Sequence, residues 1–168
     1  MHSLMNSVSD ISAPLRALYY HWLNACEDGL PPKLSALNPH RLVSGTENIV
    51  LTEILRHPDG APRDFRLLYI GRQLGTALTE PMTGICLSDI TQKGQGSRIW
   101  EAYSAIAEDP RPRLVELPYE GPDPSYDKTF ELFLPLRNDS GEQAYVLVGV
   151  ELLSHGTVAR HFRDAQSA

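Results

Sequence analysis

The acidic side chains are the first candidates for chemistry in this sequence, because two carboxylates held close together can act as general acid and base. The candidates are Asp59, Asp64, Asp89 and Glu116. Asp59 belongs to an Asp-Gly turn, Asp64 begins an expected strand, and Asp89 suits a loop or cap position. The sequence contains no Gly-x-Ser-x-Gly, no His-Glu-x-x-His and no Walker loop. We therefore expect no catalytic activity, with a small enzyme as one alternative.

The two cysteines and one glycine-rich run are the other residues with chemical potential. Cys26 and Cys86 lack the spacing of a metal site, so no metal is expected. Because the N-terminus has no secretory signal pattern, we expect both thiols to be reduced and buried. The run from Gly94 to Ser97 lacks the lysine and the preceding strand of a phosphate-binding loop. It is interpreted as a loop that leads to a helix cap at Ser97.

Two amphipathic helices are expected to position these residues. The first begins near Ser12 and ends before Gly29, and the second covers residues 97–108. Between them, residues 71–90 contain Pro81 and Gly84, so only short helices fit there. The apolar stripe of the first helix consists of Leu15, Leu18, Tyr19, Trp22 and Leu23.

Five strands are expected from apolar alternation and turn signals. Their expected ranges are 48–55, 64–70, 113–119, 128–136 and 144–153. Asp59-Gly60 and Asn138 to Gly141 are typical of the turns of two hairpins. Strands on both sides of a helical middle predict an α+β fold with an antiparallel sheet.

Length, composition and charge limit the possible classes of protein. A chain of 168 residues and 18.7 kDa, with 42% hydrophobic residues, is the size of one domain. We expect a flexible N-terminus over 1–13, a domain over 14–153, and a tail over 154–168 that is a short helix or disordered. A net charge of -6 argues against nucleic acid and against an anionic membrane surface as partners. The expected location is cytoplasmic.

Several short motifs occur in an order typical of one bacterial PAS family. The stretch from Leu15 to Trp22 is similar to the opening helix of that family, and Leu37-Asn38-Pro39 stands where its short helix lies. Residues 63–71 are similar to its Asp-Phe-Arg strand, and residues 83–89 to its Thr-Gly and Leu-Ser element. Over residues 14–153 the chain thus resembles PAS family five, first catalogued as a domain of unknown function.

The resemblance implies a five-stranded antiparallel sheet in the order 2-1-5-4-3. It also implies helices between the second and third strands, and an N-terminal flanking helix. PAS modules commonly hold a cofactor between the sheet and the helical middle. A covalent flavin needs an Asn-Cys-Arg-Phe type motif, whereas Cys86 lies in Gly-Ile-Cys-Leu. Haem needs an axial histidine, usually on the longer helix, and residues 97–108 contain none. The cofactor, if any, stays unknown.

A ligand pocket between sheet and helices is expected to be lined by aromatic residues. The candidates are Tyr69, Trp100, Tyr103 and Phe133. Each of them could instead be an ordinary core residue.

The stripe of the first helix has two interpretations. It could cover the sheet of its own chain, or it could pack against the same helix of a second chain, and a stripe this wide could do both. PAS proteins often pair through such a helix, so we expect a homodimer with Leu15, Leu18, Tyr19, Trp22 and Leu23 at its interface.

The resulting functional expectation is a stand-alone bacterial sensory or regulatory module. It would bind a small molecule and signal through rearrangement of the dimer or through a signalling partner protein. A module that binds no ligand and serves only in protein interaction or dimerisation is the main alternative.

Overall fold

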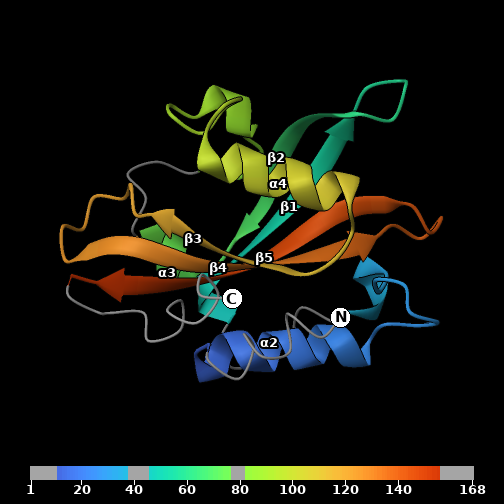
Figure 1. Cartoon of the computed structure of the whole chain (residues 1–168), viewed down its shortest axis with the longest axis horizontal. Coiled ribbons are helices and arrows are strands. Elements are labelled where there is room, and N and C mark those ends of the chain that lie inside the picture. The colour runs from blue at the N-terminus through green and yellow to red at the C-terminus, as the bar shows by residue number, and fades with distance from the viewer. Residues whose placement is uncertain (1–10, 38–45, 77–81, 156–168) are drawn as a thin grey trace, which may run out of the picture.

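A five-stranded antiparallel sheet forms the centre of the chain, with helices on both of its faces (Figure 1). The computed structural model describes residues 11–37, 46–76 and 82–155. The order of the strands is β2-β1-β5-β4-β3, and every neighbouring pair is antiparallel. The strands are β1 (Ile49–Arg56), β2 (Pro62–Ile70), β3 (Arg113–Pro118), β4 (Tyr126–Arg137) and β5 (Gln143–Ser154). The predicted α+β class and the strand order are confirmed.

The helices precede β1 or lie between β2 and β3. The α-helices are α2 (Ala13–Asn24), α3 (Arg72–Thr76) and α4 (Arg98–Glu108). Three short 3-10 helices are η1 (Leu34–Ala36), η3 (Thr46–Asn48) and η4 (Leu87–Asp89). Among the described residues, no helix has the length and apolar character needed to cross a membrane.

Helix α4 covers one face of the sheet. It begins at Ser97, whose side-chain oxygen accepts a hydrogen bond from the backbone N–H of Trp100 at 3.2 Å, as the cap interpretation predicted. Its apolar side packs against Phe65 on β2 and Phe133 on β4, and both phenylalanines have no exposed surface. The ring of Tyr103 lies 5.1 Å from each of these two rings.

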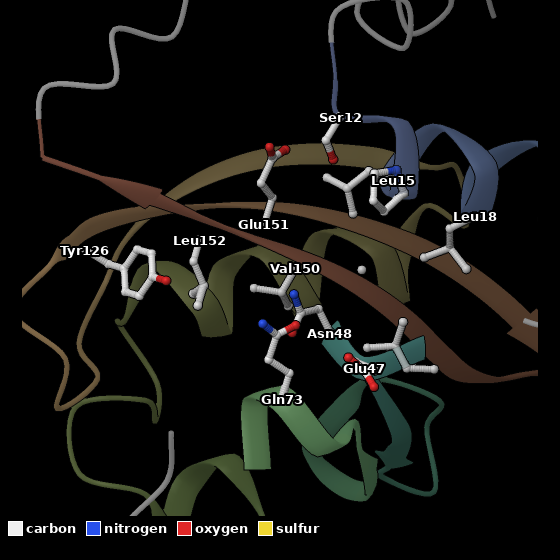
Figure 2. A pocket seen from close by; sticks show the side chains of 13 residues that line it. Ser12, Leu15, Leu18, Glu47, Asn48, Gln73, Tyr126, Val150, Glu151 and Leu152 are labelled. Atoms are coloured by element: carbon white, nitrogen blue, oxygen red, sulfur yellow. The ribbon is translucent and has the colours of Figure 1, made fainter. Parts of the chain in front are cut away.

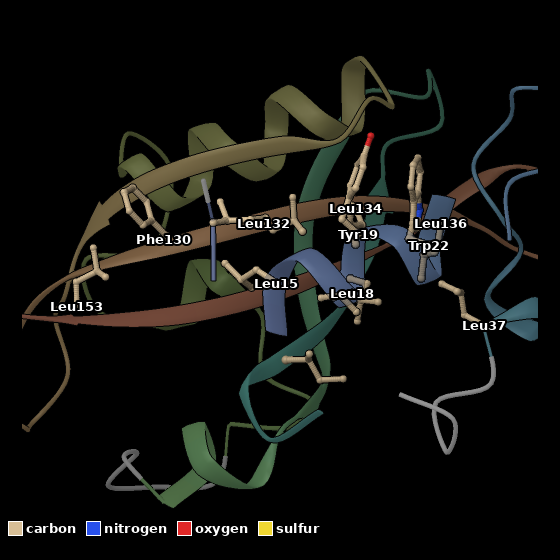
Figure 3. Close-up of a cluster of buried hydrophobic side chains, with 13 residues drawn as sticks. Leu15, Leu18, Tyr19, Trp22, Leu37, Phe130, Leu132, Leu134, Leu136 and Leu153 are labelled. Carbon is tan, nitrogen blue, oxygen red and sulfur yellow. The ribbon is translucent and has the colours of Figure 1, made fainter. Parts of the chain in front are cut away.

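Helix α2 covers the opposite face (Figure 3). Its side chains pack against the other side of β4, where Phe130, Leu132, Leu134 and Leu136 alternate with the residues that face α4. The indole N–H of Trp22 donates to the backbone oxygen of Pro135 at 2.8 Å. At the point of closest approach β5 carries Gly149, where an added Cβ would lie 2.7 Å from Leu15 and 2.6 Å from Leu18. The absence of a side chain at Gly149 therefore lets α2 lie close to the sheet.

Helix α2 is shorter than predicted. It ends at Asn24, whereas the sequence pattern allows it to continue to Gly29. Asp28 and Gly29 both have positive φ angles, which marks a tight turn rather than helix. The expected cap at Asn38-Pro39, most of the N-terminal segment and most of the C-terminal tail lie outside the described residues.

Candidate functional site

A pocket of about 380 Å³ lies between the sheet and the helical middle of the chain. It receives residues from all five strands, from α3 and α4, from the segments between α3 and α4, and from the segment between β3 and β4. Most of its wall is apolar, as is usual for a small-molecule site. The apolar side chains are Val50, Leu67, Ile70, Leu74, Met82, Leu87, Ile90, Ile99, Pro118, Pro122, Val150 and Leu152.

Glu131 is the carboxylate that β4 places in the wall of this pocket, which we call the Glu131 pocket. Its neighbours across the sheet are Val115 on β3 and Val150 on β5. Thr129 donates its hydroxyl to Glu131 Oε1 at 3.0 Å. The side chain lies deep among protein atoms but keeps partial solvent access. Burial raises the pKa of Glu131, and the Thr129 hydroxyl and the nearby Lys93 ammonium only partly oppose this.

Tyr103 joins the pocket to the centre of the sheet. Its hydroxyl lies 2.9 Å from Thr52 Oγ1, and Thr52 is fully buried on β1. Burial raises the pKa of Tyr103 and the carboxylate of Glu131 raises it further, so the phenol stays protonated. Tyr103 is therefore a fixed wall of the pocket, since its polar end is already engaged.

The rim of the pocket carries the remaining charges. Lys93, in the segment before α4, forms a 2.8 Å ion pair with Glu120, which follows β3. Both side chains are partly exposed. Next to Lys93, Gln92 adopts a positive φ of 65°, which is unusual for a residue other than glycine. Backbone conformations of this kind occur often at ligand clamps.

Of the four predicted pocket residues, Tyr103 lines the pocket. Trp100 and Phe133 are buried in the core beside it, where Trp100 packs on Phe65 with the ring centres 5.2 Å apart. Tyr69 is 48% exposed and is not part of the pocket wall. The cause is an irregularity in the pairing of β1 with β2: Leu51 pairs with Tyr69, but Thr52 pairs with Leu67. The extra residue shifts the alternation, so that Ile70 rather than Tyr69 faces the pocket.

The five residues predicted for a dimer interface lie on the inner side of α2. Leu15, Leu18, Tyr19 and Trp22 are buried in the cluster that α2 forms with its own sheet, and Leu23 packs against that cluster. The stripe therefore covers the sheet of its own chain. A second chain could reach these four buried side chains only if α2 moved away.

Three of the four carboxylates weighed as acid or base, Asp59, Asp64 and Glu116, have structural partners. Asp59 accepts a hydrogen bond from the backbone of Ala61 at 3.0 Å within the hairpin turn. Asp64 Oδ2 accepts from the hydroxyl of Ser88 at 2.5 Å, and this bond joins β2 to η4. This hydrogen bond thus connects the Asp-Phe-Arg strand to the Leu-Ser-Asp element, which are separate in the sequence.

Glu116 and the two cysteines do not form a reactive group with these residues. Glu116 pairs with Lys128 on the neighbouring strand at 2.9 Å. Cys26 and Cys86 are free thiols, as predicted, but they are only partly buried. Burial raises the pKa of each thiol, which favours the uncharged and less nucleophilic form. In the described part of the chain, no three His, Cys, Asp or Glu side chains are arranged to hold a metal ion.

A second hollow, of about 520 Å³, lies on the α2 side of the sheet (Figure 2). Ser12, Glu47, Asn48, Gln73 and Glu151 bring polar groups to it. Asn48 Oδ1 is buried there without a hydrogen-bond partner among the described residues. The polar groups of this second hollow are spread over its whole wall. The Glu131 pocket instead combines a largely apolar wall with one partly buried carboxylate.

Glu131 is the residue that the sequence reading missed. Apolar residues alternate from Phe130 to Leu136, and this pattern predicts one buried face of β4. On the opposite face, Phe133 was the one residue predicted to line the pocket. A signal was available, because a sheet covered on both faces leaves no solvent for a charged residue in the middle of a strand.

A comparison with protein-family models and a comparison with curated proteins find no match to this chain.

Proposed function

We propose that this chain is a PAS-like sensory or regulatory module that binds a small molecule in the Glu131 pocket. The observation that carries the proposal is the position of that pocket, between the sheet and the helical middle, in a fold with the strand order that the resemblance implied. Its largely apolar wall favours ligand binding over catalysis, and the candidate carboxylates Asp59, Asp64 and Glu116 have structural partners.

The pocket is well placed to convert binding into a change of packing. Its wall includes Ile99 and Tyr103 of α4 together with Val150 and Leu152 of β5, and β5 also contacts α2 on the opposite face. A ligand that prefers one position of α4 over another would bias the sheet between the two helices. The proposed output is a rearrangement within a homodimer or a change in binding to a signalling partner, in a bacterial cytoplasm.

The first experiment is native mass spectrometry of the purified protein, followed by denaturation to release anything bound. A library of small metabolites is then tested for compounds that raise the melting temperature, because a ligand of the folded state stabilises it. We expect at least one compound to bind to the wild-type protein.

The variant Ile99→Trp tests whether such a compound occupies this pocket. Ile99 lies in the pocket wall, so the larger ring should fill the space and abolish the shift. Leu30→Trp is the matched control, because Leu30 is 51% exposed and is not in the pocket wall. If no compound binds, or if Ile99→Trp binds as well as the wild type, ligand sensing at this site is wrong. A module that acts only through protein interaction then becomes the better explanation.

A further inference from the structure

The ionisable side chains of the Glu131 pocket do not balance one another. Those in its wall are Lys93, Tyr103, Tyr119, Glu120 and Glu131. Lys93 pairs with Glu120 at the rim. The hydroxyl of Tyr103 is hydrogen-bonded to Thr52 and uncharged. Glu131 is therefore the charge of this pocket that lacks an opposite charge in direct contact.

The hydrogen bonding of Glu131 is also incomplete. Among the described residues it receives one hydrogen bond, from Thr129 to Oε1. An ionised carboxylate can accept about four. The residues directly opposite Glu131 on the adjacent strands, Val115 and Val150, are apolar and supply no further side-chain donor. A buried carboxylate in this condition is costly unless a ligand completes its partners.

We infer that the ligand of the Glu131 pocket has an apolar body and one cationic nitrogen, and that the nitrogen binds to Glu131. This inference rests on the proposed function and specifies the chemical class of the ligand. The apolar wall receives the body, and the accessible part of the Glu131 carboxylate receives the charge. A volume of about 380 Å³ is at the lower end for small-molecule pockets, which favours a compact amine.

The arrangement disfavours an anionic ligand. Lys93 is the cationic side chain of the pocket wall, and its ammonium group already binds Glu120 at 2.8 Å. An anion in the pocket would have to separate that pair and would also lie near Glu131. An uncharged ligand would leave the carboxylate as it is, with Thr129 as its only hydrogen-bond donor in the described structure.

Three probes with one apolar body separate these cases: 4-phenylbutylamine, 4-phenylbutanol and 4-phenylbutanoate. Their affinities are measured by calorimetry or by NMR titration. We expect the amine to bind at least about tenfold more tightly than the alcohol, since a charge-assisted hydrogen bond is stronger than one between uncharged groups. Glu131→Gln should remove this preference. Glu101→Gln, an equal change of net charge on the exposed side of α4, should keep it.

A proton count gives an independent readout. Without a cation, burial favours the protonated form of Glu131, so binding of the amine should release a proton at a pH above the ordinary carboxyl pKa. The groups that face Glu131 are Lys93 and Glu120 at the rim and Tyr103 of α4, whereas β3 and β5 present valines. The heat of binding in two buffers of different ionisation enthalpy measures the release, which should vanish in Glu131→Gln.

Three results would overturn the inference. They are no binding of the amine, equal binding of amine and alcohol, and an amine preference that survives in Glu131→Gln. A preference for the carboxylate would point to Lys93 instead. None of these results decides the proposed function, which depends on whether any library compound binds in a manner sensitive to Ile99→Trp.

Discussion

Glu131 lies on a strand whose two faces differ: one face of β4 packs in a hydrophobic core, and the other lines the pocket. On the α2 side, β4 presents leucines and a phenylalanine that fill a core. On the α4 side, β4 presents Thr129, Glu131 and Phe133 in turn, and this face changes from polar to apolar at Phe133, which packs on Tyr103 of α4. The carboxylate lies where the core gives way to the pocket, so a charge there serves binding better than it serves packing.

The pKa of Glu131 predicts a dependence of stability on pH. Because burial raises the pKa in the folded state above the ordinary value of 4.5, the folded protein binds more protons than the unfolded chain between those two values. The free energy of unfolding contributed by Glu131 is therefore present at low pH and decreases as the pH rises through this interval. Glu131→Gln cannot titrate, so it should become progressively more stable than the wild type from about pH 4.5 upward.

Urea denaturation at a series of pH values measures this difference. Glu101→Gln is the control for the change in net charge, and its difference from the wild type should vary little with pH. A difference for Glu131→Gln that is constant, or that grows as the pH falls, would contradict a raised pKa.

At the scale of elements, the sequence predicts the existence and order of helices and strands well. Apolar alternation in β4 and β5 and the turn residues around Gly60 and Gly141 fix the two hairpins, since both glycines have the positive φ expected of such turns. The bulge near Leu68 could not be predicted in this way. It follows from the pairing with β1, and one extra residue moves Tyr69 to the other face of the sheet. The structure therefore has a pocket at the predicted place, but only Tyr103 of the four predicted residues lies in its wall.

The contact between α2 and β5 predicts the effect of a single added methyl group. Gly149→Ala places a Cβ within 2.7 Å of Leu15 and Leu18, so both leucines or the whole helix must shift. We expect a loss of roughly 1–3 kcal/mol in the free energy of unfolding, typical of overpacking. Urea denaturation followed by circular dichroism measures it.

Gly75→Ala is the matched control for that variant. Gly75 lies within α3, has no atom within 4 Å of an added Cβ and has no positive φ, so alanine should be neutral or slightly stabilising there. A stable Gly149→Ala protein would mean that the ends of Leu15 and Leu18 can move away from an added methyl group without cost.

At the scale of the whole molecule, one sheet separates two apolar clusters, and each cluster is covered by a helix of the same chain. Helix α2 therefore has a structural role, because it covers the face of the sheet opposite α4 (Figure 1). The sequence alone could not decide whether α2 covers its own sheet or contacts a second chain, since both require the same apolar stripe. The distinction depends on whether the chain bends back after α2. The hydrogen bond from Arg137 N to Pro32 O at 2.9 Å holds the segment after α2 against the end of β4.

Substitution of Trp22 tests whether α2 stabilises its own chain by covering the sheet. Trp22 is 5% exposed and donates a hydrogen bond to Pro135, so Trp22→Ala should lower the free energy of unfolding by about 3–5 kcal/mol. The molar mass of the folded fraction, measured by light scattering, should stay that of the wild type. Tyr20→Ala, on the exposed side of the same helix, should change the stability by less than about 0.5 kcal/mol.

The milder variant Trp22→Phe keeps the experiment decisive if Trp22→Ala does not fold. It should lose stability by a smaller amount, because a ring remains in the cluster while the hydrogen bond to Pro135 is lost. A dimer interface on this stripe predicts the reverse pattern, in which the variant stays folded and its mass falls to that of a single chain. Such a result would require α2 to leave its own sheet and pack on a second copy. The apolar cluster around Leu132 and Leu134, both fully buried by α2 and its neighbours, would then be open to solvent in the separated chain. Because exposing that much apolar surface is costly, loss of stability without loss of mass is the expected outcome.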